Sequence, residues 1–324
     1  MNAPCRDDTK SNPNMHADLK KKTARLSIIS NTSLFILKIA VGLCIGSVSI
    51  ISEAIHSGMD LLAAIIAFFS VKMSAEPADT QHEFGHGKFE DVSGLIEASL
   101  IFAAAVMIIW EAASKLIAGE TELIPDTMLY SGLAVMGISA VVNWYVSARL
   151  MKVAKLTESI ALESDAMHLK TDIYTSIGVF LGLILLMVTG IAAIDSLIAI
   201  GVAFVIIHAA YDLAKRSIQD LIDYSLPQED KEKIKEIICS HRSEYRGFHG
   251  LRTRRGGPNI FIEFHMVVRG DETVMESHRI GDEIEADIKK EYPQAFITIH
   301  VEPCRDIADC KRCGEFCTNK NKSK

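Results

Sequence analysis

The feature that most constrains this chain is a series of long apolar segments in its first two thirds. A membrane-spanning helix needs about 20 predominantly apolar residues. The sequence therefore predicts an α-helical membrane domain of six transmembrane helices within residues 25–217. The expected spans are residues 25–47, 50–73, 92–118, 126–149, 164–190 and 193–214.

The distribution of Lys and Arg between these spans predicts their orientation. Basic residues mark the cytoplasmic loops of membrane proteins. They occur before the first span, in the 2–3 and 4–5 connections and after the sixth span, and none occurs near residues 47–50, 119–125 or 190–193. We therefore expect both termini to be cytoplasmic, with residues 1–24 as an N-terminal cytoplasmic segment. The net charge of −7 and the lack of a basic stripe argue against nucleic acid as a partner.

The spacing His-x-x-x-Asp occurs twice in the apolar region, as His56 and Asp60 in "HSGMD" and as His168 and Asp172 in "HLKTD". Ionisable residues inside spans are rare and usually functional. A spacing of four places both side chains on one helix face. Two such faces offer two imidazole nitrogens and two carboxylate oxygens, a tetrahedral set suited to Zn²⁺. The alternative is that each residue is separately hydrogen-bonded in the bundle, but the repetition favours a metal site.

Further ionisable residues lie in or near the spans, and we interpret them as structural. An ion pair between Lys38 and Glu97 inside the bundle is one such arrangement, and snorkelling to the membrane surface is another. The residues concerned are Lys38, Glu53, Glu97 and His208.

The connection between the second and third spans reads "EPADTQHEFGHGKFED". Its Asp79, His82 and His86 are spaced by three and four residues, which fits a second set of metal ligands. An ordinary solvated loop would show the same residues. The position beside a span that carries a proposed ligand pair keeps both interpretations open.

Residues 218–303 predict a separate cytoplasmic α/β domain. A helix in "PQEDKEKIKEIICSH" precedes strands in "GLRTRRG" and "NIFIEFHMVV", which a Gly-Pro turn joins. A second helix carries Ile280, Ile284 and Ile288 at a spacing of four, and "AFITIHVE" forms the last strand. This α-β-β-α-β order is a ferredoxin-like pattern that lacks its first strand.

Four histidines and one glutamate of this domain are candidate metal ligands. His300 and Glu302 share one strand face because side chains alternate along a strand. Scattered surface histidines are the alternative. The candidates are His249, His265, His278, His300 and Glu302.

The last segment, residues 304–324, is rich in cysteine. Its Cys-x-x-Cys spacing suits thiolate binding of a metal, but the full spacing matches no common zinc finger. Metal capture and a flexible reduced tail both remain open. The residues concerned are Cys304, Cys310, Cys313 and Cys317.

These segments together resemble the cation diffusion facilitator family, and most closely its bacterial dimeric exporters of zinc and ferrous iron. The resemblance covers about residues 15–305 and rests on "SEAIHSGMD", "PADTQHEFGHGKFE", "HLKTD", "HGLRTRRGGPNIFIEFH" and "IHVEPC". It implies a homodimer in the lipid bilayer of a bacterial inner membrane. It also implies exchange of a divalent cation for protons, with Zn²⁺ as both substrate and structural ion.

The resemblance also assigns roles to individual residues. It places the transport site at His56, Asp60, His168 and Asp172, and a loop site at Asp79, His82 and His86. It implies that residues 218–303 bind metal and dimerise. It places a binuclear site at the dimer interface on His249, His265, His278, His300 and Glu302. Lys88 and Asp223 match an interlock between the two domains. The chain departs from the family at His56 and Glu302, where relatives often carry Asp, and in its cysteine tail.

The leading hypothesis is therefore a proton-coupled zinc efflux antiporter, not an enzyme. Metal binding displaces protons from its ligands, and His titrates near physiological pH. Exporters of iron, manganese, cobalt or cadmium are alternatives, because ligand sets overlap among divalent metals. An intramembrane metalloenzyme would need an open metal position and a general base, whereas two His and two Asp fill a tetrahedron. A membrane-anchored metal sensor would not need ligands on two separate spans.

Overall fold

The computed structural model describes residues 13–45, 48–118, 126–189 and 193–304. The chain divides into two compact units. The helical unit comprises Asn14–Gln219, and the C-terminal unit begins at Asp220. Each unit is described separately below.

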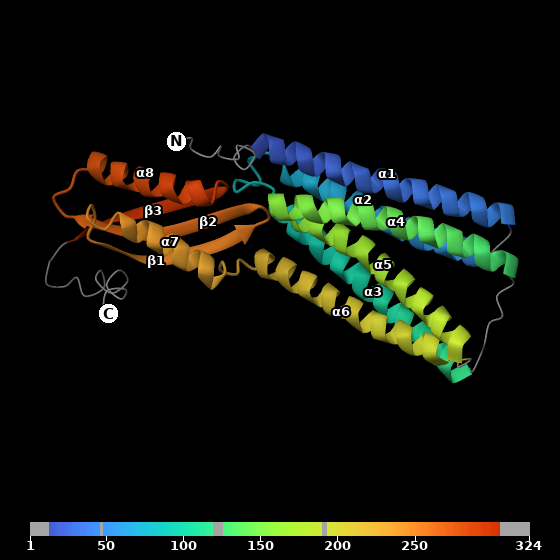
Figure 1. The fold of residues 1–324 in the computed structure, drawn as a ribbon. Coiled ribbons are helices and arrows are strands. Elements are labelled where there is room, and N and C mark those ends of the chain that lie inside the picture. The colour runs from blue at the N-terminus through green and yellow to red at the C-terminus, as the bar shows by residue number, and fades with distance from the viewer. Residues whose placement is uncertain (1–12, 46–47, 119–125, 190–192, 305–324) are drawn as a thin grey trace, which may run out of the picture. The chain divides into compact units, whose positions relative to one another are not determined.

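Six helices make up the helical unit in the part of the chain described here (Figure 1), which confirms the predicted α-helical architecture. They are α1 (Pro13–Ile45), α2 (Val48–Ser74), α3 (Lys88–Ala118), α4 (Asp126–Thr157), α5 (Ile160–Thr189) and α6 (Ala193–Leu221). By length and composition, four described stretches can cross a membrane. These stretches are Met15–Val41, Ser57–Ser74, Lys88–Ser114 and Ser196–Leu221.

The helices extend beyond the predicted apolar spans. The first helix begins at Pro13, although its apolar span begins at residue 25, and α4 continues to Thr157 past a span that ends at residue 149. Apolar length reflects the thickness of the bilayer, whereas a helix continues for as long as its backbone hydrogen bonds do. Proline at the first position of α1 fits the usual start of a helix.

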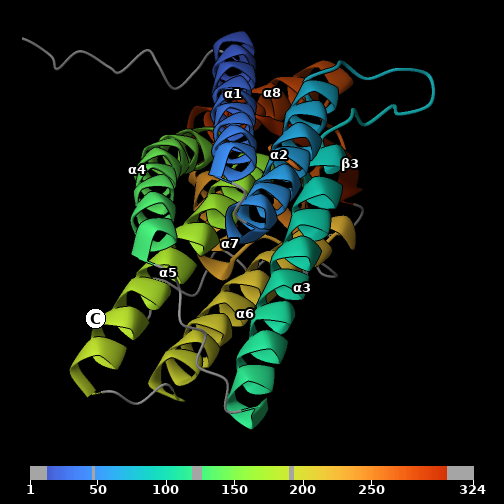
Figure 2. The same ribbon diagram turned by 90° about the vertical axis from the view of Figure 1, so that its right-hand side faces the viewer.

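The fifth helix packs against α2, α3 and α4 (Figures 1 and 2). Small residues allow the close approach, since Ala161 and Ala166 of α5 are fully buried. At Gly94 of α3, an added Cβ would lie 2.5 Å from Ile160 Cγ2 and 2.7 Å from Ser217 Oγ. The starts of α3 and α5 therefore lie side by side, close to the end of α6.

The C-terminal unit has the predicted order α-β-β-α-β. Its elements are α7 (Gln228–Ser240), β1 (Gly247–Gly256), β2 (Asn259–Arg269), α8 (Val274–Glu291) and β3 (Ala295–Cys304). Within the described residues the sheet order is β1-β2-β3, with β1 antiparallel and β3 parallel to β2. In a ferredoxin-like unit the first strand lies between the two strands that correspond to β2 and β3. The direct parallel pairing of β2 and β3 therefore agrees with a unit that lacks that first strand.

The two helices cover one face of this sheet. Ile262, Phe264 and Met266 of β2 are buried in one core with the isoleucines of both helices. Ile280, Ile284 and Ile288 are each at most 1% exposed, as their spacing predicts. The side chains that alternate with the β2 core residues, including His265, therefore lie on the opposite face.

Candidate metal sites

The predicted transport site joins α2 and α5. The Nε2 atom of His168 lies 3.1 Å from Oδ1 of Asp60, and these side chains are only 8% and 5% exposed. The other ring nitrogen, Nδ1, is buried and has no hydrogen-bond partner among the described residues. Two predicted ligands from different spans thus lie in contact inside the bundle.

Asp172 lies one helical turn beyond His168, on the same helix. Its Oδ2 accepts a hydrogen bond of 3.2 Å from Nδ2 of Asn143 on α4. The ligand atoms of Asp60, His168 and Asp172 do not converge within 4.8 Å among the described residues. Asn143 was not predicted, although an amide in the apolar sequence "VVNWYV" is the kind of signal that could have identified it.

His56 belongs to α2, four residues before Asp60, as predicted. Its side chain and that of Glu53 lie outside the described residues. The role of His56 as the fourth ligand therefore stays a prediction.

The structure gives Lys38 and Glu97 different polar partners. Lys38 donates its Nζ to Ser57 Oγ at 2.7 Å, one turn from Asp60. Glu97 accepts a 3.3 Å hydrogen bond from Ser93 of its own helix.

A buried ion pair that the sequence did not reveal joins α1 to α3. Lys20 Nζ lies 2.8 Å from Glu90 Oε1, and the Glu90 side chain is fully buried. Ser159, just before α5, donates to the other Glu90 oxygen. No sequence pattern links residues 70 positions apart, so in the sequence Lys20 is only one of the basic residues that precede the first span.

The predicted loop site is assembled in the connection between α2 and α3. Asp79 places its carboxylate oxygens 3.3 Å from His82 Nδ1 and 3.2 Å from His86 Nε2. One ligand atom from each residue lies within 4.8 Å of the others. Backbone N–H groups of His82 and Gln81 donate to Asp79 and hold the pKa of its carboxyl below the usual value. The loop therefore presents an ionised oxygen between two imidazoles.

The same segment spells His-Glu-x-x-His, the pattern that zinc metalloproteases carry on a helix. Here residues 82–86 lie in turns that precede α3. The match therefore lacks the helical face that places the two histidines and the glutamate of those enzymes.

A second cluster lies on the open face of the sheet, where His249 of β1 pairs with His265 of β2 and His265 pairs with His300 of β3. Glu302 Oε1 lies 2.7 Å from His265 Nδ1, and its Oε2 lies 3.0 Å from His249 Nε2. The rings of His249 and His265 are 4.9 Å apart. Gly250, with φ of +67°, forms the bulge next to His249, and a Cβ there would lie 3.2 Å from the His265 ring.

The electrostatics of this cluster favour a bound cation. His265 and then His249 hold the pKa of the Glu302 carboxyl below its usual value. The site therefore combines an ionised carboxylate with imidazole nitrogens, which are suitable ligands for Zn²⁺.

The remaining predicted ligands lie at the edge of this cluster or elsewhere. His300 Nε2 is 3.9 Å from Glu302, whereas His278 pairs with Asp282 on α8 at 3.0 Å. Cys304 is the last residue of β3, and Cys310, Cys313 and Cys317 lie outside the described residues.

The proposed interlock of Lys88 with Asp223 stays a prediction, since each residue belongs to a different unit. Asp223 has a positive φ of 59° and accepts a hydrogen bond from Arg254.

A third group with metal-ligand geometry comprises His241, Glu244 and Glu283. It was not predicted, because it joins the end of α7 to the middle of α8. Arg279 donates to both of its carboxylates, at 2.9 Å to Glu244 and 2.6 Å to Glu283. This group is accordingly an ion-pair network in the structure.

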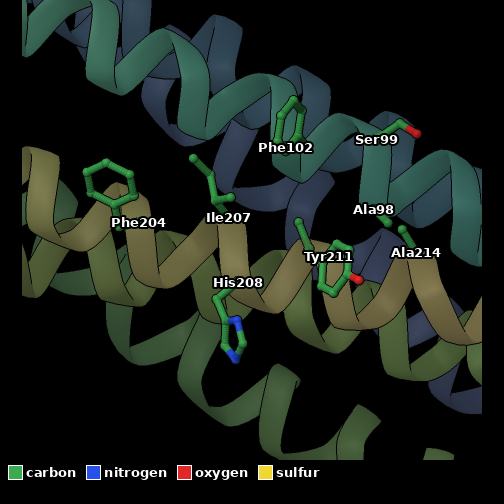
Figure 3. Close-up of a pocket in the computed structure, with 9 residues that line it drawn as sticks. Ala98, Ser99, Phe102, Phe204, Ile207, His208, Tyr211 and Ala214 are labelled. Carbon is green, nitrogen blue, oxygen red and sulfur yellow. The ribbon is translucent and has the colours of Figure 1, made fainter.

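A hollow of about 510 Å³ lies between α3 and α6 (Figure 3). Phe102, Phe204 and Ile207 make much of its lining apolar. The His208 ring points away from α3 and pairs with Asp212 of its own helix at 3.6 Å. The lining thus offers no set of metal ligands.

Comparison with known proteins identifies both units. The cation efflux transmembrane domain matches residues 24–222, and the cytoplasmic domain of cation efflux proteins matches residues 226–304. An uncharacterized transporter of Synechocystis is 34% identical over 302 residues, which is 93% of this chain and 96% of that protein. The cation-efflux pump FieF of Pectobacterium atrosepticum is 32% identical over 279 residues, or 86% of this chain and 91% of the pump. A solved chain of CzrB in a zinc form is 45% identical over 24% of this chain and 90% of that chain, with a TM-score of 0.24.

The matched domains together cover most of the chain, and the relatives match it from near one end to the other. They account for the six-helix unit and the α/β unit. The chain belongs to the cation diffusion facilitator family and is an integral membrane protein for the efflux of divalent metal cations.

Proposed function

We propose that this protein is a homodimeric antiporter that exports Zn²⁺ in exchange for protons. It works in a bacterial inner membrane with both termini in the cytoplasm. The observation that carries the proposal is the buried contact between His168 and Asp60 on two different helices of the bundle.

A histidine and an aspartate at membrane depth are costly unless a partner or a function requires them. His168 and Asp60 neutralise each other when the site holds a proton between them. A divalent cation replaces that proton, because ligands bind metal in their deprotonated forms. The same atoms therefore serve both ions alternately, which is the requirement for exchange.

Selectivity for Zn²⁺ follows from the expected ligand set. Two imidazole nitrogens and two carboxylate oxygens suit a tetrahedral Zn²⁺ ion better than the harder Mn²⁺ ion. His56 and His168 would supply the nitrogens, and Asp60 and Asp172 the oxygens.

The loop site and the sheet cluster bind Zn²⁺ on the cytoplasmic side. The sheet cluster stabilises the dimer through His249, His265 and Glu302, with His278 and His300 as further ligands. Its exposed imidazoles are accessible to cytoplasmic metal.

Reconstitution in proteoliposomes tests the proposal. An imposed pH gradient should drive Zn²⁺ uptake into vesicles, and collapse of the gradient with a protonophore should stop it. Each of several divalent metals is compared under the same gradient. Zn²⁺ flux that is indifferent to the gradient would contradict proton coupling, and faster flux of another metal would contradict zinc as the substrate.

A further inference from the structure

Two buried carboxylates lie next to the transport site, and the mechanism above does not use them. Asp165 is on α5, three residues before His168, and Glu97 is on the neighbouring helix α3. Both residues are fully buried. Their charges act on each other, and Asp165 also acts on His168 and Asp60.

These carboxylates lack the partners that other buried acids of the bundle have. Glu90 has Lys20, and Asp60 has His168. Both oxygens of Asp165 and Oε2 of Glu97 have no hydrogen-bond partner among the described residues. In the same described residues no basic side chain pairs with either one.

Hydroxyl groups complete the surroundings of this acidic pair. Ser27 of α1 faces Asp165, and its Oγ is buried without a hydrogen bond. Ser93 donates to Oε1 of Glu97, and Ser164 lies beside the same carboxylate. Carboxylate and hydroxyl oxygens from three helices are therefore neighbours here, and the two carboxylates keep oxygen atoms that can still bind a cation.

Two adjacent carboxylates without a counter-charge are expensive in a buried environment. The cost falls when a cation lies between them. Carboxylate and hydroxyl oxygens are the ligands that hard divalent cations prefer, and they hold Zn²⁺ less tightly than a site with imidazoles does. A transported cation would therefore bind to such a set of oxygen ligands only briefly.

The pair also lies on a route to the transport site. The start of α3 adjoins the loop site, and Glu97 is about 10 Å further along α3 than Glu90, at 1.5 Å per residue. The starts of α3 and α5 are in contact at Gly94 and Ile160. Asp165 lies about 4.5 Å before His168 along α5. The acidic pair is thus between the loop end of the bundle and His168.

We propose that Glu97 and Asp165 form a second cation subsite, which the transported ion occupies on its way between the loop end of the bundle and the transport site. The proposal rests on the proposed transport function for its cargo. The subsite itself is an oxygen site for divalent cations, and Mn²⁺ is a suitable probe because carboxylates bind it and its bound form has a distinct EPR signal.

The test uses the full chain in nanodiscs and counts bound Mn²⁺ by equilibrium dialysis and EPR. The substitution Asp60→Asn first disables the transport site. Adding Glu97→Gln to this background should remove one further Mn²⁺ per chain, and adding Asp165→Asn should do the same. Glu97→Asp keeps a carboxylate and should keep the ion. The matched control is Glu163→Gln, which removes a carboxylate of α5 that pairs with Arg216 outside the subsite.

An unchanged Mn²⁺ count after Glu97→Gln in the Asp60→Asn background would overturn the subsite. In the otherwise native chain, Glu97→Gln should lower Zn²⁺ flux at least tenfold at subsaturating Zn²⁺, while Glu163→Gln should not. If Glu97→Gln removed one bound Mn²⁺ but left the Zn²⁺ flux undiminished, the subsite would not lie on the transport route. Absence of flux in the native chain would contradict the proposed function instead, and the Mn²⁺ count would still report on the subsite.

Discussion

The Nε2 atom of His168 lies 3.1 Å from Oδ1 of Asp60, although the two residues are 108 positions apart in the sequence. Their helices present a base and an acid to each other inside the bundle. A metal ion bound there must take its ligands from both helices at once. Any motion of α2 against α5 therefore changes the geometry of the site directly.

Removing a single carboxylate from this site should abolish transport. Asp172→Ala and Asp60→Ala each leave three of the four proposed ligands, which is one too few for the tetrahedral set around Zn²⁺. We expect Zn²⁺ flux in proteoliposomes to fall to the level of empty vesicles. Asp212→Asn, at an exposed position of α6, is the control and should transport normally. Undiminished flux in Asp172→Ala would remove that residue from the site.

The substitution His56→Asp should widen metal selectivity. A carboxylate binds through one or two oxygens and tolerates larger ions, whereas imidazole favours tetrahedral Zn²⁺. We expect the variant to keep Zn²⁺ transport, to gain Cd²⁺ and to transport Zn²⁺ at lower pH, because an exposed carboxyl loses its proton near pH 4. Parallel Zn²⁺ and Cd²⁺ flux from about pH 5.5 to 8 measures this. Equal Cd²⁺-to-Zn²⁺ ratios in both proteins would show that His56 does not set selectivity.

Zinc should stabilise a dimer of the isolated C-terminal unit, residues 218–305. A ligand that binds only the folded form raises the free energy of unfolding by about 2.7 kcal/mol at a hundredfold excess over Kd. The melting temperature should therefore rise with Zn²⁺, and sedimentation should show a dimer. The double substitution of His265 and His300 by Ala should abolish the shift. A melting curve that Zn²⁺ leaves unchanged in the native sequence would disprove this site.

Gly94→Ala should destabilise the helical unit. The added Cβ would press on Ile160 and Ser217, and overpacking of this kind typically costs about 1–3 kcal/mol. Gly201→Ala on α6 is a matched control, because among the described residues no atom beyond its chain neighbours and its own helix backbone lies within 4 Å of the added Cβ. Thermal inactivation in detergent should be faster for Gly94→Ala and unchanged or slower for Gly201→Ala. Equal rates would show that α3 can move away from its neighbours at no cost.

Acid should weaken the C-terminal unit partly through Asp287. Hydrogen bonds from Lys290 and His241 hold the pKa of this carboxyl below its usual value. Its ionised form therefore stabilises the fold above about pH 4, and this contribution is lost as the pH falls through the lowered pKa. In urea unfolding of residues 218–305 with a chelator, Asp287→Asn should lose less stability between pH 7 and pH 3 than the native sequence. Identical losses would count against an ionised Asp287 in the folded unit.

The sequence predicts the elements of this fold well because their patterns are local. The isoleucines of α8 show their buried face in a spacing of four, and Gly257 with Pro258 marks the turn between β1 and β2. Helix ends in the bundle are predicted less well. The first apolar span begins only at residue 25, and nothing in its pattern shows that α1 already begins at Pro13.

The proposed ligand residues of the bundle can be picked out from the sequence for the same reason, since His and Asp four positions apart form a local pattern. Their surroundings are not. Asn143 reaches Asp172 from another helix, and Lys20 reaches Glu90 across the bundle. Contacts of this kind depend on the rotation and depth of each helix in the packed bundle, which a single sequence does not encode locally.

The loop site and the sheet cluster differ in how they can change during evolution. The sheet cluster is distributed over three strands whose register aligns His249, His265 and His300. A one-residue insertion in the turn at Gly257 would shift β1 against β2 and turn its side chains to the opposite face. Evolution can therefore exchange single ligands of that cluster by substitution, whereas an insertion in the turn would disrupt the cluster. The loop ligands occupy one short segment, residues 79–86, so a single deletion or exchange of that segment would remove or replace them as a block.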